Sequence, residues 1–201
     1  MSSLQELCKK IETCQKCDLH KISSGKVCGE GDENAGLVIL GIAPGKEEVE
    51  QGRPFVGPSG RKLREKLETI SKKFGIDFTS YVYITNLVKC FPNTNGKVKD
   101  PTKKQIQVCA EFLLEEISLL HKANCIVILG ELPASYFRLG KLSTFGNNPR
   151  PVKIGDRTFA CFRTYHPSYL IRTHDQQASK HFHTILVKAL ISSWLTYQAK
   201  Y

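Results

Sequence analysis

The stretch Leu37-Val-Ile-Leu-Gly-Ile-Ala-Pro-Gly45 decides the fold of this 201-residue chain. Its first part, residues 37–42, is a short continuous apolar run, as expected for a strand buried on both faces of a parallel sheet. A turn that contains proline and glycine follows directly. A strand that ends in such a turn usually presents a binding site at its carboxyl end. Because the turn contains no acid, base or nucleophile, the chemistry of the site is expected from other segments.

Segments with strand and helix character alternate along the rest of the chain. Strands are predicted at residues 37–42, 81–88, 125–129 and 157–165, the last one after a turn at Gly155-Asp156. Helices are predicted at residues 3–13, 60–73, 102–122, 131–139 and 176–199. This alternation indicates a three-layer α/β/α fold with a central, mostly parallel four-stranded sheet. We expect a single domain over residues 1–201, because no repeat or linker interrupts the sequence.

The carboxyl ends of parallel strands meet at one edge of a sheet, where ligands bind. In this chain those ends hold residues 41–45, 86–90, 130–131 and 165–172. We therefore expect these four segments to converge on one site. Residues 93–101 are expected to form a polar loop.

The charge balance indicates a polyanionic partner. Lys and Arg number 29 against 19 Asp and Glu, which gives a formal net charge of +10. A surface this basic favours nucleic acid, although solubility alone would also explain it. No segment approaches the ~20 apolar residues that span a bilayer, and the N-terminus lacks the apolar core of a signal peptide. We expect no membrane contact and a cytoplasmic location, near the nucleoid in a prokaryote.

Four of the eight cysteines are candidate metal ligands. Cys14-x-x-Cys17 follows the first predicted helix, Cys90 lies just past the second strand, and Cys109 lies on the helix after it. The start of that helix can fold back beside the strand end. Four thiolates suit either a tetrahedral zinc ion or a cubane iron–sulfur cluster, and the spacing does not decide between them.

The other four cysteines have no such pattern. Cys125 and Cys161 lie inside apolar strands, where cysteine behaves as a small hydrophobe. Cys8 is expected to pack on its helix, since disulfides are disfavoured in a reducing compartment. Cys28 precedes Gly29-Glu-Gly31 in a turn and is not excluded as a ligand.

Together these motifs resemble the uracil-DNA glycosylase superfamily, most closely the family 4 type that carries an iron–sulfur cluster. The matching residues, in the family order, are Cys14-x-x-Cys17, Gly29-Glu-Gly31, Gly41-x-Ala-Pro-Gly45, Gly52-Arg-Pro-Phe-Val-Gly57 with Gly60, Ile84-Thr-Asn-Leu-Val-Lys-Cys90, Cys109, and Thr164-Tyr-His-Pro-Ser-Tyr-Leu-Ile-Arg172. The resemblance implies a [4Fe–4S] cluster held by Cys14, Cys17, Cys90 and Cys109. It also implies that an N-terminal arm of about residues 1–30 binds this cluster.

The resemblance further implies a pocket that reads a flipped-out uracil in DNA. Phe55 matches the stacking aromatic, and Gly41 and Ala43 belong to the turn that contacts the base. Asn86 matches the asparagine that reads the O4/N3 edge of uracil. His166 matches the histidine that donates a hydrogen bond to uracil O2 while negative charge grows on the leaving base.

The segment after His166 is expected to enter DNA. Tyr169 or Leu170 is a candidate wedge for the gap that the flipped base leaves, with core packing as the alternative for Leu170. The candidate phosphate contacts are Ser59, Gly60, Ser168 and Arg172. No lysine stands out as a Schiff-base nucleophile, so a monofunctional glycosylase that leaves an abasic site is expected. The partner is DNA, and a monomer is expected.

Two positions depart from the family pattern. Ile42 stands where the family has a glutamate that positions the attacking water, and Val49 stands where an aspartate is usual. Loss of a general base typically costs ~10²–10⁴-fold in rate, so uracil excision remains our first interpretation. The turn around Ile42 would then contribute through its backbone. The carboxylate of Glu47 or Glu48 is a candidate substitute for the missing glutamate. The alternatives are excision of another deaminated base, such as hypoxanthine or xanthine, and DNA binding without catalysis.

Overall fold

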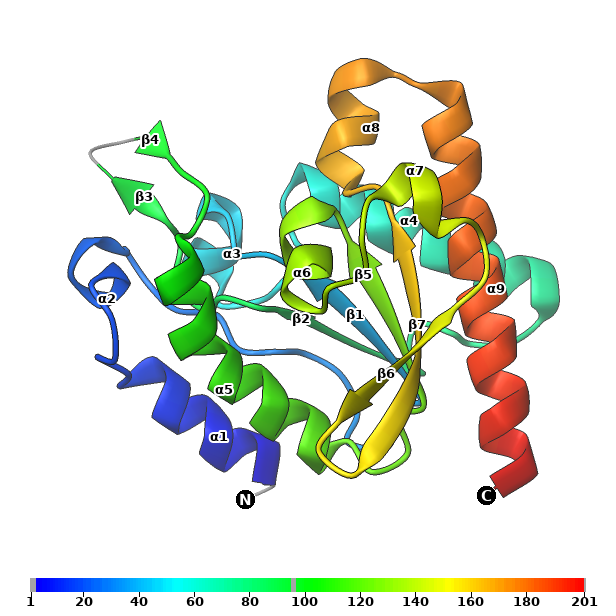
Figure 1. Ribbon diagram of the computed structural model, residues 1–201, viewed down its shortest axis with the longest axis horizontal. Coiled ribbons are helices and arrows are strands. Elements are labelled where there is room, and N and C mark those ends of the chain that lie inside the picture. Colours follow the sequence, from blue (N-terminus) through cyan, green and yellow to red (C-terminus); the bar gives the residue numbers. More distant parts are fainter. Residues whose placement is uncertain (1–2, 95–96, 201) are drawn as a thin grey trace.

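A five-stranded sheet forms the centre of the molecule, with the strand order β2-β1-β5-β7-β6 (Figure 1). Its strands are β1 (Leu37–Gly41), β2 (Val82–Asn86), β5 (Cys125–Leu129), β6 (Arg150–Ile154) and β7 (Arg157–Thr164). Strands β2, β1, β5 and β7 run parallel, whereas β6 is antiparallel to β7 at one edge. The mostly parallel α/β sheet is therefore confirmed, with five strands in place of the predicted four.

The edge strand β6 is the one that the sequence pattern missed. Its residues are exposed or half-buried, so it lacks the apolar run by which the other strands were recognised. It also contains Pro151, which a sheet tolerates at an edge. The turn from β6 to β7 places Gly155 at a φ of 59°, in the left-handed region that glycine adopts readily. The predicted Gly155-Asp156 turn thus closes a hairpin.

The computed structural model describes residues 3–94 and 97–200, so residues 1–2 of the expected arm, residues 95–96 of the expected loop and residue 201 lie outside the described part. The long helices are α1 (Ser3–Glu12), α4 (Pro58–Phe74), α5 (Lys103–Leu119) and α9 (Gln176–Lys200). The short helices are α2 (Leu19–Ile22), α3 (Lys46–Gln51), α6 (Glu131–Tyr136), α7 (Leu142–Phe145) and α8 (Pro167–Thr173). None of the described helices combines the length and apolar character that crossing a bilayer requires.

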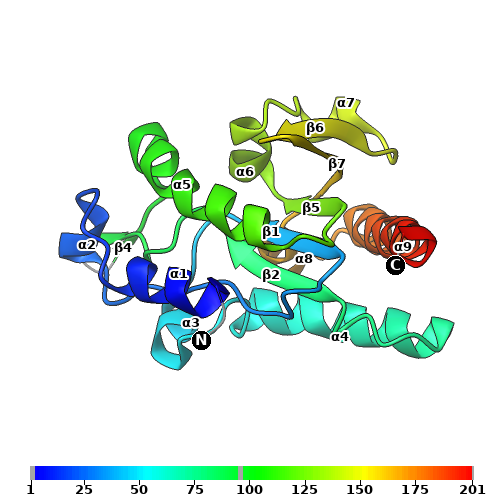
Figure 2. The same cartoon turned by 90° about the horizontal axis from the view of Figure 1, so that it is seen from below.

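The helices cover both faces of the sheet, which gives the predicted three layers (Figure 2). Strand β5 shows the division, because successive side chains of a strand point to opposite faces. Ile126 and Ile128 pack in the core that includes α1 and α5. Val127 and Leu129 pack in the core that includes α4 and α9. All five residues of β5 are buried, as the apolar run predicts for a central strand.

Two short strands, β3 (Asn93–Thr94) and β4 (Lys97–Val98), pair antiparallel within the segment expected to be a polar loop. In Figure 1 this hairpin projects at the same end of the molecule as α3. Each strand has only two residues, which is too short for an alternating pattern to mark it in the sequence. The hairpin forms part of the wall of the site described below.

The structure joins Cys8 of α1 to Cys28 by a disulfide, with the two Cα atoms 5.6 Å apart. The expectation that Cys8 only packs, and that Cys28 is open as a ligand, is therefore wrong. The reason is tertiary, because the bond joins the N-terminal helix to the loop that precedes β1. Cys125 and Cys161 are buried in their strands as predicted.

Candidate functional site

A cavity of about 450 Å³ lies where β1, β2 and β7 end. Its lining includes residues 42–48, Phe55, Gly57, Pro58, Ser59, Asn86, Pro92, Val98, Lys99, Asp100, Pro101, His166 and Ser168. Three of the four segments expected to converge therefore do so. The fourth, residues 130–131, does not line the cavity, but Gly130 lies behind it: a Cβ at this position would come within 3.3 Å of the His166 Cβ.

Gly41 is not among the residues that line the cavity, but it packs directly against two residues that are. A Cβ at this position would lie 2.4 Å from Asn86 Oδ1 and 2.6 Å from the Phe55 ring. Both distances are too short for non-bonded contact, so any side chain here would displace one of these two residues. Phe55 itself is buried, and its ring centroid lies 6.1 Å from that of His166. Gly41, Phe55, Asn86 and His166 thus meet at one point.

Asn86 is the last residue of β2 and is only 3% exposed. Its Oδ1 atom is buried and has no hydrogen-bond partner among the described residues. A buried amide oxygen without a partner is costly, and in a cavity wall it indicates a ligand that donates a hydrogen bond. Gly41 pairs with Asn86 across the β1–β2 ladder, which aims this oxygen over the glycine.

His166 begins helix α8 and is held by Ser168. The His166 Nδ1 atom lies 2.8 Å from Ser168 Oγ and accepts a hydrogen bond from the Ser168 N–H at 3.2 Å. Because Nδ1 accepts, the proton of the neutral ring is assigned to Nε2. Burial, and to a smaller extent the nearby Arg172 charge, together lower the pKa of His166 to about 4. The ring is therefore a neutral donor above pH ~5.

The turn around Ile42 has no carboxylate at the position of the family glutamate. The two candidate substitutes, Glu47 and Glu48, are bound to other groups. Glu48 accepts hydrogen bonds from three backbone N–H groups, those of residues 45, 56 and 57. Glu47 forms an ion pair with Arg61 at 2.8 Å. The cavity has a further carboxylate on its rim, Asp100, which the sequence analysis missed because it lies in the segment expected to be a plain loop.

The candidate DNA contacts divide into two groups. Ser59 and Ser168 line the cavity, and Arg172 is exposed and donates a hydrogen bond to Ser168 Oγ at 3.3 Å. Tyr169 is half-buried and stacks on Tyr165, with ring centroids 5.1 Å apart.

Two of the candidates do not fit a DNA-contacting role in this structure. Leu170 is only 6% exposed and packs in the core with α9, so the alternative of packing holds for it. Gly60 is buried against Phe55, where a Cβ would lie 1.9 Å from the Phe55 carbonyl carbon. Close packing of α4 on the Phe55 loop explains this glycine without a phosphate.

The structure brings the four candidate metal ligands to one small cavity lined by Cys14, Cys17, Cys90 and Cys109. Burial raises the pKa of the Cys90 thiol to about 12 and that of Cys109 to about 11. Among the described residues, no three of the four sulfur atoms lie within 4.8 Å of one another.

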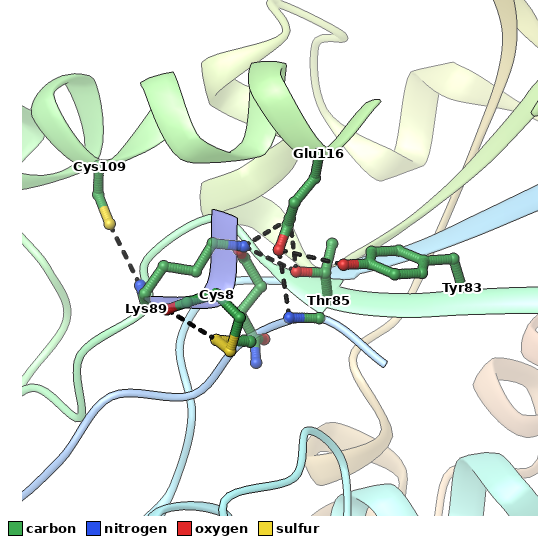
Figure 3. A network of polar contacts seen from close by, with 9 residues as sticks. Cys8, Tyr83, Thr85, Lys89, Cys109 and Glu116 are labelled. Atoms are coloured by element: carbon green, nitrogen blue, oxygen red, sulfur yellow. Dashed lines mark hydrogen bonds and ion pairs between the residues drawn. A yellow bond between two sulfur atoms is a disulfide. The ribbon is translucent and has the colours of Figure 1, made fainter. Parts of the chain in front are cut away.

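A buried polar network that the sequence did not reveal centres on Lys89 and Glu116 (Figure 3). The Lys89 ammonium donates to Glu116 Oε2 at 2.6 Å, to Thr85 Oγ1 at 2.8 Å and to the Asn86 carbonyl at 2.8 Å. The Lys89 N–H donates to Cys109 Sγ at 3.2 Å. Tyr83 and the Gly29 N–H complete the network by donating to Glu116 Oε1. Lys89 thus contacts both the residue that ends β2 and a candidate metal ligand.

Comparisons with known proteins agree with the geometry. The family model described as the uracil DNA glycosylase superfamily matches residues 28–189. The type-4 uracil-DNA glycosylase of Archaeoglobus fulgidus is 38% identical over 136 residues, a match that covers 68% of this chain and 64% of that protein, just under two thirds of its length.

Two further relatives match over more of their length. The type-4 uracil-DNA glycosylase of Pyrobaculum aerophilum is 35% identical over 181 residues, which cover 84% of this chain and 85% of that protein. The corresponding protein of Thermotoga maritima is 35% identical over 172 residues and covers 84% and 83%. With a matching family model, two relatives aligned over most of their length and the α/β sheet that ends in this pocket, the chain belongs to the uracil-DNA glycosylase superfamily.

Proposed function

We propose that the protein excises uracil from DNA by hydrolysing the N-glycosidic bond, which leaves an abasic site. The observation that carries this proposal is the meeting of three groups in one cavity: an aromatic face, an amide with a free acceptor, and a neutral imidazole donor. The type-4 relatives and the net charge of +10 support DNA as the substrate.

Each group has one task in the proposed reaction. The target nucleotide leaves the duplex and its base enters the cavity, where Phe55 stacks on the ring. The free Oδ1 of Asn86 accepts a hydrogen bond from the base, and its amide N–H₂ group is available to donate one. This pairing suits the N3–H and O4 of uracil.

His166 stabilises the charge that develops when the bond to the sugar breaks. The leaving uracil carries negative charge on O2, and the Nε2–H of His166 is the donor proposed to meet it. Ser168 orients this donor by occupying Nδ1, so no reorientation is needed during the reaction. The proton stays on His166, because uracil leaves as an anion. A water molecule then adds to the sugar cation, and the proton that this water loses passes to solvent and neutralises the uracil anion.

The apolar Ile42 side chain cannot act as a general base for the attacking water. Glu48 is bound by three backbone N–H groups, and Glu47 is paired with Arg61, so neither is free as they stand. We propose that the sugar cation is captured by water with little assistance, at a cost of ~10²–10⁴-fold in rate relative to an enzyme with a positioned base. Substitution of Ile42 by glutamate should then raise the rate.

A second substrate class has one observation in its favour. The apolar Ile42 side chain lines a cavity of about 450 Å³, which has room for a purine, so hypoxanthine or xanthine is the alternative substrate. DNA binding without catalysis is the third possibility. It would leave the free acceptor of Asn86 without a purpose.

The test uses labelled single- and double-stranded oligonucleotides that carry one uracil, hypoxanthine or xanthine, followed by alkali treatment. We expect strand breaks after alkali only in the uracil oligonucleotides, and none before alkali. Breaks only at hypoxanthine or xanthine would establish the second substrate class. No breaks in any strand would overturn the glycosylase proposal, and His166→Ala serves as the matched inactive control.

We further propose that Cys14, Cys17, Cys90 and Cys109 hold a [4Fe–4S] cluster. The gathering of the four thiols around one small cavity and the burial of two of them support this assignment, because thiols with a raised pKa are stabilised as thiolates by bound metal. Such a cluster would be structural, since four protein ligands leave no open coordination position. Anaerobically purified protein should be brown and contain roughly four iron atoms per chain. Colourless protein with one zinc ion would contradict the assignment.

The remaining contacts follow from the exposed groups. We propose that Ser59, Ser168 and Arg172 contact DNA phosphates and that Tyr169, the accessible member of the predicted wedge pair, fills the space left by the flipped base. We also propose a monomer and a single domain in which the arm before β1 packs on α5 through Leu7 and Ile11. Binding should weaken steeply with salt, as expected for phosphate contacts.

A further inference from the structure

Phe55 has a strained backbone. Its φ is 54°, in the left-handed region that a bulky side chain rarely adopts. The residue is nevertheless buried and lines the cavity. A residue in this conformation persists only when its surroundings hold it there, and such positions are common at functional sites. The neighbouring groups should therefore include the parts that impose the conformation.

The Arg64 side chain of α4 holds the loop from the carbonyl side. Its Nε atom donates to the Phe55 carbonyl at 3.0 Å, and one terminal nitrogen donates to the Pro54 carbonyl at 3.0 Å. Gly60, one turn earlier on α4, has no side chain and lets this helix approach the Phe55 backbone. The guanidinium thus fixes two successive peptide groups with one rigid, planar side chain.

Glu48 of α3 holds the same loop from the amide side. Its Oε1 atom accepts hydrogen bonds from the N–H groups of Val56 at 3.1 Å and Gly57 at 2.8 Å. Arg64 therefore binds the peptide group before Phe55, and Arg64 and Glu48 together bind the peptide group after it. These contacts fix the backbone on both sides of Phe55.

Glu30 fixes Arg64 in turn. The Glu30 carboxylate pairs with Arg64 at 3.2 Å and with Arg53 at 2.6 Å. Its own backbone exchanges two hydrogen bonds with Ile84 of β2, at 2.8 and 2.9 Å. The Gly29-Glu30-Gly31 motif, which the proposed reaction leaves without a role, thus ties the loop of Phe55 to the central sheet.

We infer that Arg64 and Glu30 are positioning residues that hold Phe55 in its strained conformation as a preformed stacking platform for the flipped base. The inference rests on the proposed function, because the platform has a purpose only if a base enters the cavity. Neither residue contacts the base. They act through the Phe55 backbone, and Glu30 acts through Arg64.

Stability alone is a weak explanation for this arrangement. The side chains of Glu30, Arg53 and Arg64 are 33%, 56% and 31% exposed, and exposed ion pairs contribute little to folding. Arg53 also supplies a matched control. It pairs with the same carboxylate through its side chain, at 2.6 and 3.2 Å, but within the described part of the chain that side chain donates no hydrogen bond to the Pro54 or Phe55 carbonyl.

The experiment compares Arg64→Met, Glu30→Gln and Arg53→Gln in single-turnover and steady-state excision of uracil. We expect Arg64→Met to lower kcat roughly tenfold or more with KM within about twofold, because a strained backbone that loses its support populates other conformations. Glu30→Gln should have a smaller effect in the same direction, and Arg53→Gln should be close to the wild type. A rise in KM at unchanged kcat for Arg64→Met would instead identify Arg64 as a phosphate contact and overturn the inference.

A double-mutant cycle tests whether Arg64 acts through Phe55. In a Phe55→Ala background, Arg64→Met should cause little further loss, since the platform is already absent. Equal losses in both backgrounds would overturn the inference.

A second measurement does not require activity, so it separates failure of this inference from failure of the proposed function. Amide hydrogen exchange at Val56 and Gly57 should be faster in Arg64→Met than in Arg53→Gln. Equal exchange in the two variants would show that Arg64 does not hold the loop, whatever the wild-type protein excises.

Discussion

Two charged networks flank the pocket, and they differ in burial. Lys89 and Glu116 lie behind Asn86 with side chains 1% and 2% exposed. The Glu30 pairs lie behind Phe55 with side chains about one third to one half exposed. Both networks hold a pocket residue through its backbone carbonyl: Lys89 donates to that of Asn86 and Arg64 to that of Phe55.

The difference teaches how charge can be used for positioning. Burying an ion pair removes two charges from water, which costs free energy that their mutual attraction offsets. Removing one partner therefore leaves an unpaired charge in the core. A half-exposed pair keeps much of its hydration, so its loss costs little folding energy. We therefore expect the Lys89 network to matter for stability and position together, and the Glu30 network mainly for position.

The largest expected effect separates the two networks by stability. Glu116→Leu leaves the buried Lys89 ammonium without its counter-ion, and we expect a loss of about 3–5 kcal/mol in the free energy of unfolding. The double variant Lys89→Met/Glu116→Leu should recover most of this loss, because it removes both charges. Urea denaturation of the three proteins measures the difference. Equal stability of the single and double variants would show that the pair is not the source of the loss.

The next effect concerns the third wall of the pocket, which neither network holds. His166→Ala should lower kcat for uracil excision ~10²–10³-fold, as is typical when one key charge-stabilising donor is lost. The free energy of unfolding should change much less than in Glu116→Leu, because His166 lies at the start of α8 in the wall of the cavity. Single-turnover kinetics alongside urea denaturation tests both statements. A loss of stability as large as that of Glu116→Leu would remove the distinction.

A smaller effect is expected in the titration of His166. Its folded pKa of about 4 lies below the ordinary value of 6.5, because burial and then Arg172 disfavour the charged ring. The unfolded chain therefore binds this proton more readily than the folded one. The contribution of His166 to stability should be fully present above pH 6.5 and be lost as the pH falls toward 4.

Arg172→Gln removes the nearby positive charge and should raise the His166 pKa. An NMR titration of the imidazole in the wild type and this variant measures the shift without DNA. An unchanged or lower pKa would contradict a contribution from the Arg172 charge. Glu30 belongs to the network behind Phe55, so Glu30→Gln should leave the His166 pKa unchanged.

Part of the fold and of the pocket can be predicted from the sequence, and part cannot. Continuous apolar runs marked β1 and β5, β-branched and aromatic residues marked β2, and the turn after β1 marked the end of the sheet where the pocket lies. The family resemblance, which rests on local motifs, singled out Phe55, Asn86 and His166, and all three line the cavity. The short strand β6 and the hairpin β3–β4 carry too few buried residues to leave a pattern.

The charged residues behind the pocket could not be predicted from the sequence for a different reason. Lys89 and Glu116 are 27 positions apart, and Arg64 and Glu30 are 34 apart. In a sequence a lysine or glutamate on a helix indicates a solvated face, and only the packing of α5 on the sheet buries Glu116. The disulfide between Cys8 and Cys28 was missed in the same way, because it joins segments that meet only in the folded chain.

The smallest expected effect tests the exposed network directly. Glu30→Gln should lower the free energy of unfolding by about 0.2–1 kcal/mol at low salt, as exposed ion pairs typically do. The loss should shrink at ~1 M salt, where the screening length falls to ~3 Å, whereas the loss in Glu116→Leu should persist because its pair is buried. Urea denaturation of both variants at low and high salt measures the two responses. A salt-independent loss in Glu30→Gln would mean that Glu30 stabilises the fold by packing. The two networks would then not differ through the solvent exposure of their ion pairs.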